Sequence, residues 1–159
     1  MIMSKGQGER NMNLKGVFSH ESDHWETPKK LYEAFMKNDF TDPCPLHCKE
    51  NNLDNFYCQQ KLFINPPFSQ LSRWVKQAIQ WSMHGCEIWL LMPSRTDTKY
   101  FKELADCRCF IWFFTGRLHF NDSKNPAPFP TMIVRLGEDV WENTFAHGSI
   151  EEFIRICLE

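Results

Sequence analysis

Residues 61–68 read Lys-Leu-Phe-Ile-Asn-Pro-Pro-Phe, and this stretch decides more about the fold than any other. Residues 61–64 form a short apolar run that two prolines stop, which is the pattern of a buried strand. In open α/β sheets, ligands bind beyond the carboxyl ends of the strands. The next four residues, Asn65-Pro66-Pro67-Phe68, therefore stand where a ligand or a reaction is expected.

These four residue types suit the binding of an exocyclic amino group on a base. Such a nitrogen is a poor nucleophile because its lone pair is delocalised into the ring. The side-chain oxygen of Asn65 and the carbonyl of Pro66 are two acceptors for its hydrogens, and Pro67 helps to fix their backbone. Phe68 offers a flat face on which an extruded base can stack. The alternative is a plain turn that ends a strand, since Asn and Pro are ordinary turn residues.

Strands and helices alternate on both sides of this stretch. Apolar runs predict five strands, at residues 40–43, 61–64, 88–92, 109–114 and 131–136. Apolar residues at helical spacing predict helices that begin near Thr27, Ser69, Asp97 and Ser149. The alternation implies an α/β fold with a mostly parallel sheet. The last two strands are joined without a clear helix, so we expect one strand to be antiparallel.

The chain has 159 residues, which is enough for one hydrophobic core. We expect a flexible N-terminal arm at 1–22, a catalytic domain at 23–137, and an acidic tail at 138–159 whose C-terminal helix packs on the domain. No apolar run reaches the roughly 18–20 residues that span a bilayer, and the polar N-terminus does not resemble a signal peptide. With seven cysteines and no export signal, the expected location is a reducing cytoplasm, with no membrane partner.

The densest group of cysteines and histidines has a composition that suits zinc but a spacing that does not. It consists of Cys44, His47, Cys48 and Cys58. The group lacks a paired CxxC motif, and Cys44 stands between two prolines. Small buried thiols in a loop are the favoured interpretation, and no metal is predicted.

The net charge of −2 alone argues against a nucleic-acid partner, because affinity for phosphates depends on Lys and Arg. Its distribution argues otherwise. Residues 138–159 hold six acids and one base, a net of −5, whereas residues 60–135 hold ten bases and five acids, a net of +5. The central part of the chain is therefore compatible with moderate, salt-sensitive binding to DNA.

Four stretches, in this order, resemble the phage-type DNA N-6-adenine methyltransferases, a Dam-related family. They are Trp25-Glu26-Thr27-Pro28, Asn65-Pro66-Pro67-Phe68, residues 93–98 (Pro-Ser-Arg-Thr-Asp-Thr), and residues 116–120 (Gly-Arg-Leu-His-Phe) followed by 127–130 (Ala-Pro-Phe-Pro). The resemblance implies a reduced Rossmann-like class I methyltransferase fold. It also implies a phage or prophage origin, S-adenosylmethionine as the methyl donor, and transfer to N6 of adenine in DNA. A homodimer is a further possibility for so small a domain acting on a duplex.

The donor site is expected at two segments. Trp25, Thr27 and Pro28 resemble the segment that lines the methionine end of the donor, and a helix N-terminus there suits a carboxylate. A plain helix cap is the alternative. Asp42-Pro43-Cys44 follows the first expected strand, where related enzymes bind the donor, although the family's Gly-rich turn is missing. Asp42 is a candidate acceptor for the donor's ammonium group, or it simply caps a turn.

About 18 residues separate Asp42 from Lys61, too few for the two strand–helix units that larger methyltransferases place there. An acid on one of those units holds the donor ribose in the larger enzymes. Asp54 is our candidate for that role, and a solvated polar loop is the alternative.

Four residues are candidates for contact with DNA: Arg95, Arg117, Lys124 and Phe129. Both arginines follow apolar strands, and a guanidinium binds phosphate through two parallel hydrogen bonds. Structural ion pairing is the alternative for each. The loop 121–130 contains Lys124 and Phe129, and its prolines are equally consistent with plain stiffening.

Two other functions remain open from the sequence. Similar Asn-Pro-Pro-aromatic motifs occur in methyltransferases that act on RNA bases or on glutamine amides, and no separate target-recognition domain is evident here. The missing glycine turn is also compatible with a non-catalytic remnant that binds S-adenosylmethionine or DNA.

Overall fold

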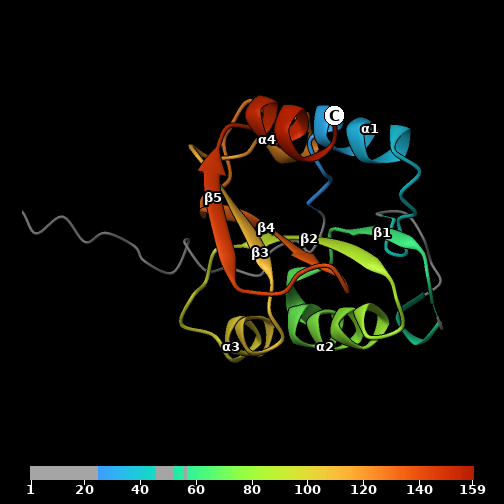
Figure 1. Cartoon of the computed structure of the whole chain (residues 1–159). Helices are drawn as coiled ribbons and strands as arrows, with labels where there is room; N and C mark the ends of the chain where they lie inside the picture. Colours follow the sequence, from blue (N-terminus) through green and yellow to red (C-terminus); the bar gives the residue numbers. More distant parts are fainter. Residues whose placement is uncertain (1–24, 46–51, 56) are drawn as a thin grey trace, which may run out of the picture.

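The computed structural model describes residues 25–45, 52–55 and 57–159. Within them, helices cover both faces of one sheet (Figure 1). Helices α1 (Lys29–Lys37) and α4 (Ile150–Cys157) lie side by side on one face, and α2 (Leu71–Ser82) and α3 (Lys99–Asp106) cover the other. Three short 3-10 turns complete the helical elements of the described residues: η2 (Asn52–Asp54), η3 (Phe68–Gln70) and η4 (Phe120–Asp122).

The sheet has five strands in the order β1-β2-β4-β3-β5. Their bounds are β1 Lys61–Ile64, β2 Glu87–Pro93, β3 Phe110–Phe114, β4 Thr131–Leu136 and β5 Thr144–Gly148. The α/β class and the five-stranded sheet are confirmed. The expectation of a mostly parallel sheet is met only in part. The β4 strand alone runs against the others, but its central place makes two of the four pairings antiparallel.

One expected strand is wrong and one strand was not expected. Residues 40–43 form only an isolated parallel bridge, in which the Thr41 N–H donates to the Lys61 carbonyl at 2.8 Å. The fifth strand is instead β5, which pairs with β3 at the edge of the sheet. Four of its five residues are not buried, so the segment carries no apolar run that predicts a strand. Residues 138–159 therefore supply a strand of the sheet as well as helix α4.

The two faces of the sheet are packed differently. Ile88, Leu90 and Met92 of β2 point into an apolar core beneath α2 and α3. Trp89 and Leu91 point to the opposite side, beneath α1 and α4, where many of the packed side chains are aromatic. This alternation follows from the period of two residues in a strand. After its first residue, Glu87, β2 is apolar at every position, which is typical of a strand buried on both faces.

Helix α4 is attached to the sheet through one buried aromatic side chain. Phe153 is fully buried and its ring packs against those of Trp89 (5.3 Å between centroids), Trp112 (5.6 Å) and Phe114 (5.7 Å). Removal of such a side chain costs about 3–5 kcal/mol of stability. The predicted helix start near Ser149 is confirmed, and a capping box forms there: Ser149 accepts from the Glu152 N–H and Glu152 accepts from the Ser149 N–H.

The other helix starts differ from the prediction by one or two residues. Pro28, and not Thr27, is the N-cap of α1, and the helix begins at Lys29. Ser69 lies inside η3, so α2 begins at Leu71 without a side-chain cap. Thr98, and not Asp97, caps α3 by accepting from the Phe101 N–H. In the first case the reason is a tertiary contact, since the Thr27 hydroxyl bonds to Asn65.

No helix in the described ranges is both long enough and apolar enough to cross a membrane.

Candidate active site

The topology brings several polar residues to one edge of the sheet. Asn65 follows β1, Ser94 follows β2, and Asp42 follows the bridge at Thr41 that lies beside β1. These three chain segments run parallel, so their carboxyl ends meet at the same edge. The β4 strand runs the other way, so its first residue, Thr131, opposite Pro93, lies at this edge too. The position expected for chemistry is therefore occupied by polar side chains from four segments.

Among the described residues, the side-chain amide of Asn65 makes hydrogen bonds through its nitrogen and none through its oxygen. Its Nδ2 donates to the Trp25 carbonyl and to the Thr27 hydroxyl, the latter at 3.0 Å. Its Oδ1 is buried and has no hydrogen-bond partner among the residues that the structure describes. A buried carbonyl oxygen without a donor costs about 1–3 kcal/mol. The arrangement therefore presents an acceptor that is ready for a ligand N–H.

The carbonyls of the two prolines after Asn65 differ in their backbone partners. Pro67 has an extended backbone (φ −60°, ψ 132°), and its carbonyl accepts from the Gln70 N–H at 2.9 Å in the η3 turn. Within the described ranges, no backbone N–H donates to the carbonyl of Pro66. Asn65 and Pro66 thus keep the two acceptors that the sequence predicts, on a backbone that proline restricts.

Four aromatic rings form a cluster next to these acceptors. Trp25 stacks on Phe68 with 6.0 Å between ring centroids and 16° between planes. Phe129 packs edge-on against both, at 5.2 Å from Trp25 and 5.1 Å from Phe68. Phe120 completes the cluster at 5.7 Å from Trp25. Three motifs far apart in the sequence therefore meet here. Phe129, predicted for DNA contact, lies half-buried in the cluster.

The loop that carries Phe120 is tied to the segment that carries Trp25. The Glu26 N–H donates to Asn121 Oδ1, and the Asn121 N–H donates to the Glu26 carbonyl at 3.0 Å. Asn121 adopts a left-handed conformation (φ 57°), which Asn tolerates better than most residues. Sequence reasoning missed both Asn121 and Phe120 as site residues, because their partners are more than 90 residues away.

Asp42 is half-buried beside this edge. Burial raises the pKa of its carboxyl from 3.8 to about 6, and a hydrogen bond from the Cys44 N–H opposes the shift. That bond, 2.8 Å to Oδ1, makes Asp42-Pro43-Cys44 a capped turn. Burial, followed by the negative charge of Asp42, also raises the pKa of Tyr32. A carboxylate partly removed from water binds a cation more strongly than an exposed one. The capped turn therefore holds a carboxylate that suits an ammonium group.

Two hydroxyls at the same edge were not anticipated. Ser94 Oγ and Thr131 Oγ1 are buried and, within the described part of the chain, lack a hydrogen-bond partner. Thr131 is 1% exposed, and the Ser94 N–H donates to the carbonyl of Pro130 just before it. In the sequence, Ser94 is marked by its place after a strand and within the 93–98 motif, whereas Thr131 is marked only by its place at the start of a strand.

Asp54 does not join this cluster. It is exposed on η2 and lines a groove of about 660 Å³ on the outer surface of α2 and α3. The other walls of the groove include Arg73, Lys76 and Glu103. This location does not support the predicted contact with the donor ribose. The alternative, a solvated polar segment, describes it better.

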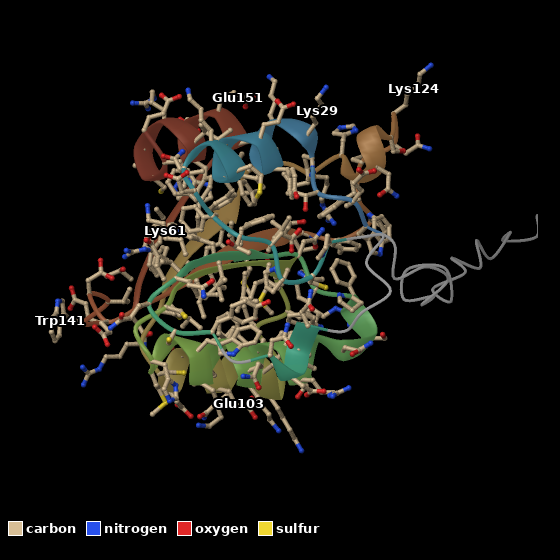
Figure 2. The ribbon with its side chains drawn as sticks, turned by 90° about the vertical axis from the view of Figure 1, so that its right-hand side faces the viewer. Lys29, Lys61, Glu103, Lys124, Trp141 and Glu151 are labelled. Carbon is tan, nitrogen blue, oxygen red and sulfur yellow. The ribbon has the colours of Figure 1, made fainter. Side chains whose placement is uncertain are left out.

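The three basic candidates for DNA contact are all exposed. Arg95 follows β2 and Arg117 follows β3, and Lys124 projects from the loop beyond Phe120. Figure 2 shows Lys124 extending away from the body of the protein, on the same side as Lys29 of α1. Exposed cations that surround a polar edge suit contact with phosphates.

The cysteine-rich group falls only partly within the described residues. Cys44 is half-buried and Cys58 is exposed, while His47 and Cys48 lie outside the described ranges. No three metal-ligating side chains come together elsewhere in the part of the chain that the structure covers.

The sequence matches the family described as DNA N-6-adenine-methyltransferase (Dam) over residues 16–131, well over half of the chain. The protein is therefore a methyltransferase by class, and the chain belongs to this DNA N-6-adenine-methyltransferase family. The resemblance drawn from the four motifs is confirmed.

Among solved structures, a protein from Agrobacterium tumefaciens described as a predicted O-methyltransferase is similar, with 14% identity and a TM-score of 0.41. The alignment covers 65% of this chain and 49% of that one, so this chain spans about half its length. The comparison with curated proteins returns no match.

Proposed function

We propose that the protein transfers a methyl group from S-adenosylmethionine to the N6 amino group of adenine in DNA. Membership of the family supports the reaction class. The observation that carries the proposal is the buried Oδ1 of Asn65, which has no partner among the described residues and lies beside the cluster of Trp25, Phe68 and Phe129. An acceptor next to flat apolar rings suits a base that bears an amino group.

Asn65 and Pro66 act on the amino group itself. Two acceptors that bind the two N6 hydrogens favour a tetrahedral nitrogen, whose lone pair is no longer delocalised into the ring. Because the acceptors are fixed before the base arrives, no reorganisation is needed during the reaction. Phe68 supplies the stacking surface, and the base leaves the duplex to reach it.

The donor is assigned to the same edge. When bound, S-adenosylmethionine supplies a methyl group already activated by its sulfonium, so the protein's task is to position the acceptor nitrogen. Asp42, held by the turn through Pro43 and Cys44, fits the donor's ammonium group. Trp25, with Thr27 and Pro28 at the start of α1, fits its methionine end, since a helix N-terminus favours a carboxylate.

Binding of DNA is assigned to exposed cations around the site. Arg95, Arg117 and Lys124 are exposed, and residues 60–135 carry a net charge of +5. Contacts with phosphates position a duplex without reading its sequence. We expect DNA affinity to fall steeply with salt, because each neutralised phosphate releases counterions.

The test is methyl transfer from labelled S-adenosylmethionine to double-stranded DNA, with single-stranded DNA, RNA and a glutamine-containing protein as parallel substrates. We expect methyladenine in DNA and no methylation of the RNA or the protein. Asn65→Ala should lose transfer while calorimetry still detects donor binding, and Asn125→Ala, an exposed Asn of the 121–130 loop, should match the wild type. Donor binding without methylation of any DNA would refute the proposal, as would an active Asn65→Ala protein.

A further inference from the structure

We infer that Thr27, together with the Trp25 carbonyl, is a positioning residue that sets the orientation of the Asn65 amide, and that Asn121 holds their segment in place. The inference deepens the proposed function, because it explains how the acceptor oxygen comes to face the substrate. It concerns contacts between residues 38 to 95 positions apart in the chain.

An amide side chain has a donor end and an acceptor end of nearly the same shape. Only the acceptor end of Asn65 can bind an amino group, so a flipped amide would present N–H groups to N–H groups. The Trp25 carbonyl is an acceptor and nothing else, so the group that faces it must be the NH₂. Thr27 Oγ1 accepts the second hydrogen at 3.0 Å. Both hydrogens are therefore bound on the protein side, which directs Oδ1 to the substrate side.

The same two bonds strengthen the acceptor. When an amide NH₂ donates to two acceptors, electron density shifts toward its oxygen, because chains of hydrogen bonds polarise one another. Oδ1 is buried, so water does not screen this effect. A more negative oxygen binds the hydrogens of an amino group more strongly, and it does so most when the nitrogen becomes tetrahedral and attacks.

Asn121 fixes the segment that provides these contacts. Glu26 lies between Trp25 and Thr27, and its N–H and carbonyl both bond to Asn121. The neighbouring Phe120 packs edge-on against the Trp25 ring. The loop after β3 therefore holds residues 25–27 from one side, and Asn65 holds them from the other.

The first test separates positioning from donor contact. Thr27→Val keeps the shape but removes the hydroxyl. At saturating donor and DNA it should slow single-turnover methyl transfer about 10–100-fold, less than the roughly 10²–10³-fold expected for loss of a group that binds the reacting atoms directly. Thr27→Ser should restore the rate to within about 3-fold, because the acceptor returns. Thr144→Val, on exposed β5, is the matched control and should not change the rate. The inference is overturned if Thr27→Val transfers the methyl group at the wild-type rate at saturating donor and DNA, and only needs a higher donor concentration to reach that rate.

Asn121→Gly tests the loop. Glycine accepts the left-handed φ of 57°, so the substitution removes the side-chain bond to Glu26 without backbone strain. We expect about 3–10-fold slower transfer at saturation, less than for Thr27→Val because the Asn121 backbone bond remains. Asn125→Gly in the same loop is the control. Equal rates for the two glycine variants would remove Asn121 from the inference.

The second test does not depend on activity. Asn65→Asp places a carboxyl against the Trp25 carbonyl, which only a protonated oxygen can contact favourably. Ionisable groups on the segments around Asn65 include Glu26, Lys29, Tyr32, Asp42 and His119, with the exposed Arg95 and Arg117 beyond. The two acids disfavour a further negative charge, whereas the arginines favour it from solvent.

We therefore expect the introduced carboxyl to titrate well above the ordinary pKa of an aspartic acid. Because this folded-state pKa is raised, the variant should lose stability relative to the wild type as pH rises from about 4 to 8. Thermal unfolding across this range, with NMR titration of the labelled carboxyl, measures it. An ordinary pKa and a pH-independent difference in Tm overturn the inference, whatever the activity. A raised pKa in Asn65→Asp, together with a wild-type protein that binds the donor but methylates no DNA, refutes the proposed function alone.

Discussion

Two polar clusters lie at opposite ends of the same central strands, and they are built in opposite ways. At the start of β2, Glu87 accepts from Arg135 of β4 at 3.1 Å and from the indole of Trp89, and Arg135 also donates to Asp139 at 2.8 Å. At the other end of these strands, Ser94 and Thr131 have buried hydroxyls that find no partner among the described residues.

The difference teaches how to separate structural from functional polar groups in this fold. In the paired cluster each charge has an opposite partner that offsets part of the cost of removing it from water, so the fold itself accounts for these side chains. A buried polar group without a hydrogen-bond partner costs about 1–3 kcal/mol of stability, and no interaction in the folded protein compensates for it. Trp74, Tyr100 and Glu103, on α2 and α3, also have buried polar atoms without a partner among the described residues, so this deficit alone does not mark a functional group. Asn65, Ser94 and Thr131 differ from them because they share the edge of the sheet at which ligands bind in open α/β folds.

The largest expected effect is on activity at the unpaired end. Asn65→Ala removes the acceptor and should reduce methyl transfer about 10²–10³-fold or more. Its stability should change by only about 1 kcal/mol, because two hydrogen bonds are lost but an unsatisfied oxygen is removed as well. Single-turnover transfer and denaturant unfolding measure the two quantities. A large loss of stability with a proportionate loss of activity would make Asn65 a structural residue.

Substitution in the paired cluster of Glu87, Arg135 and Asp139 should reduce stability but not activity. Burial alone would lower the pKa of Arg135, but the bonds with Asp139 and Glu87 outweigh it and raise that pKa. Arg135→Met should cost about 1–3 kcal/mol, because it leaves Glu87 half-buried and without its cation. Asp139 is more exposed and contributes less. Transfer per folded molecule should be unchanged, which assays on protein purified at low temperature can check. A specific loss of transfer would end the contrast between the two clusters.

Asp42 allows a test by pH. Its folded-state pKa is raised to about 6 from 3.8, so the ionised carboxylate lowers stability. The wild type should therefore lose about 1–2 kcal/mol relative to Asp42→Asn as pH rises from 4 to above 6. Donor affinity should instead rise with pH, because the donor's ammonium group binds the ionised form of Asp42. Donor binding should therefore weaken below pH 6. Calorimetry with S-adenosylmethionine at pH 5 and 8, and Tm at the same values, measure both. Parallel pH profiles of the variant and the wild type would exclude Asp42.

The parts of this site that the sequence predicts are those carried by local pattern. The apolar run at 61–64 and its two prolines predict a strand end, and Asn65 lies directly after β1 because its neighbours in the sequence set that position. The contacts of Thr27 and Asn121 could not be predicted in the same way. Thr27 has the features of a helix cap, but Asn65 binds its hydroxyl, so a contact across 38 residues overrides a local preference.

The β5 strand shows the same limit in the fold. Its sequence, Thr-Phe-Ala-His-Gly, has one buried residue, and its conformation is set by pairing with β3. Asn143 assists from just before the strand, since its side chain accepts from the Cys109 N–H and donates to the Ala105 carbonyl. Pairing at an exposed edge leaves little trace in local hydrophobicity.

The smallest expected effect is that of Thr131→Val, which tests directly whether the paired and unpaired clusters differ in role. Thr131→Val replaces an unpartnered, 1% exposed hydroxyl with a methyl group of similar size, and Thr131 bonds to nothing else through that oxygen among the described residues. The variant should therefore be more stable than the wild type by about 0.5–1 kcal/mol, which is unusual for a threonine in a strand. If the hydroxyl serves a ligand, the same variant should bind S-adenosylmethionine or transfer its methyl group about 3–10-fold less well. Thr144→Val on exposed β5 should show neither change.

A gain in stability together with a loss of function would assign Thr131 to the site. A loss of stability would show that the hydroxyl has a structural partner, and the contrast between the two ends of the sheet would then rest on Asn65 and Ser94 alone.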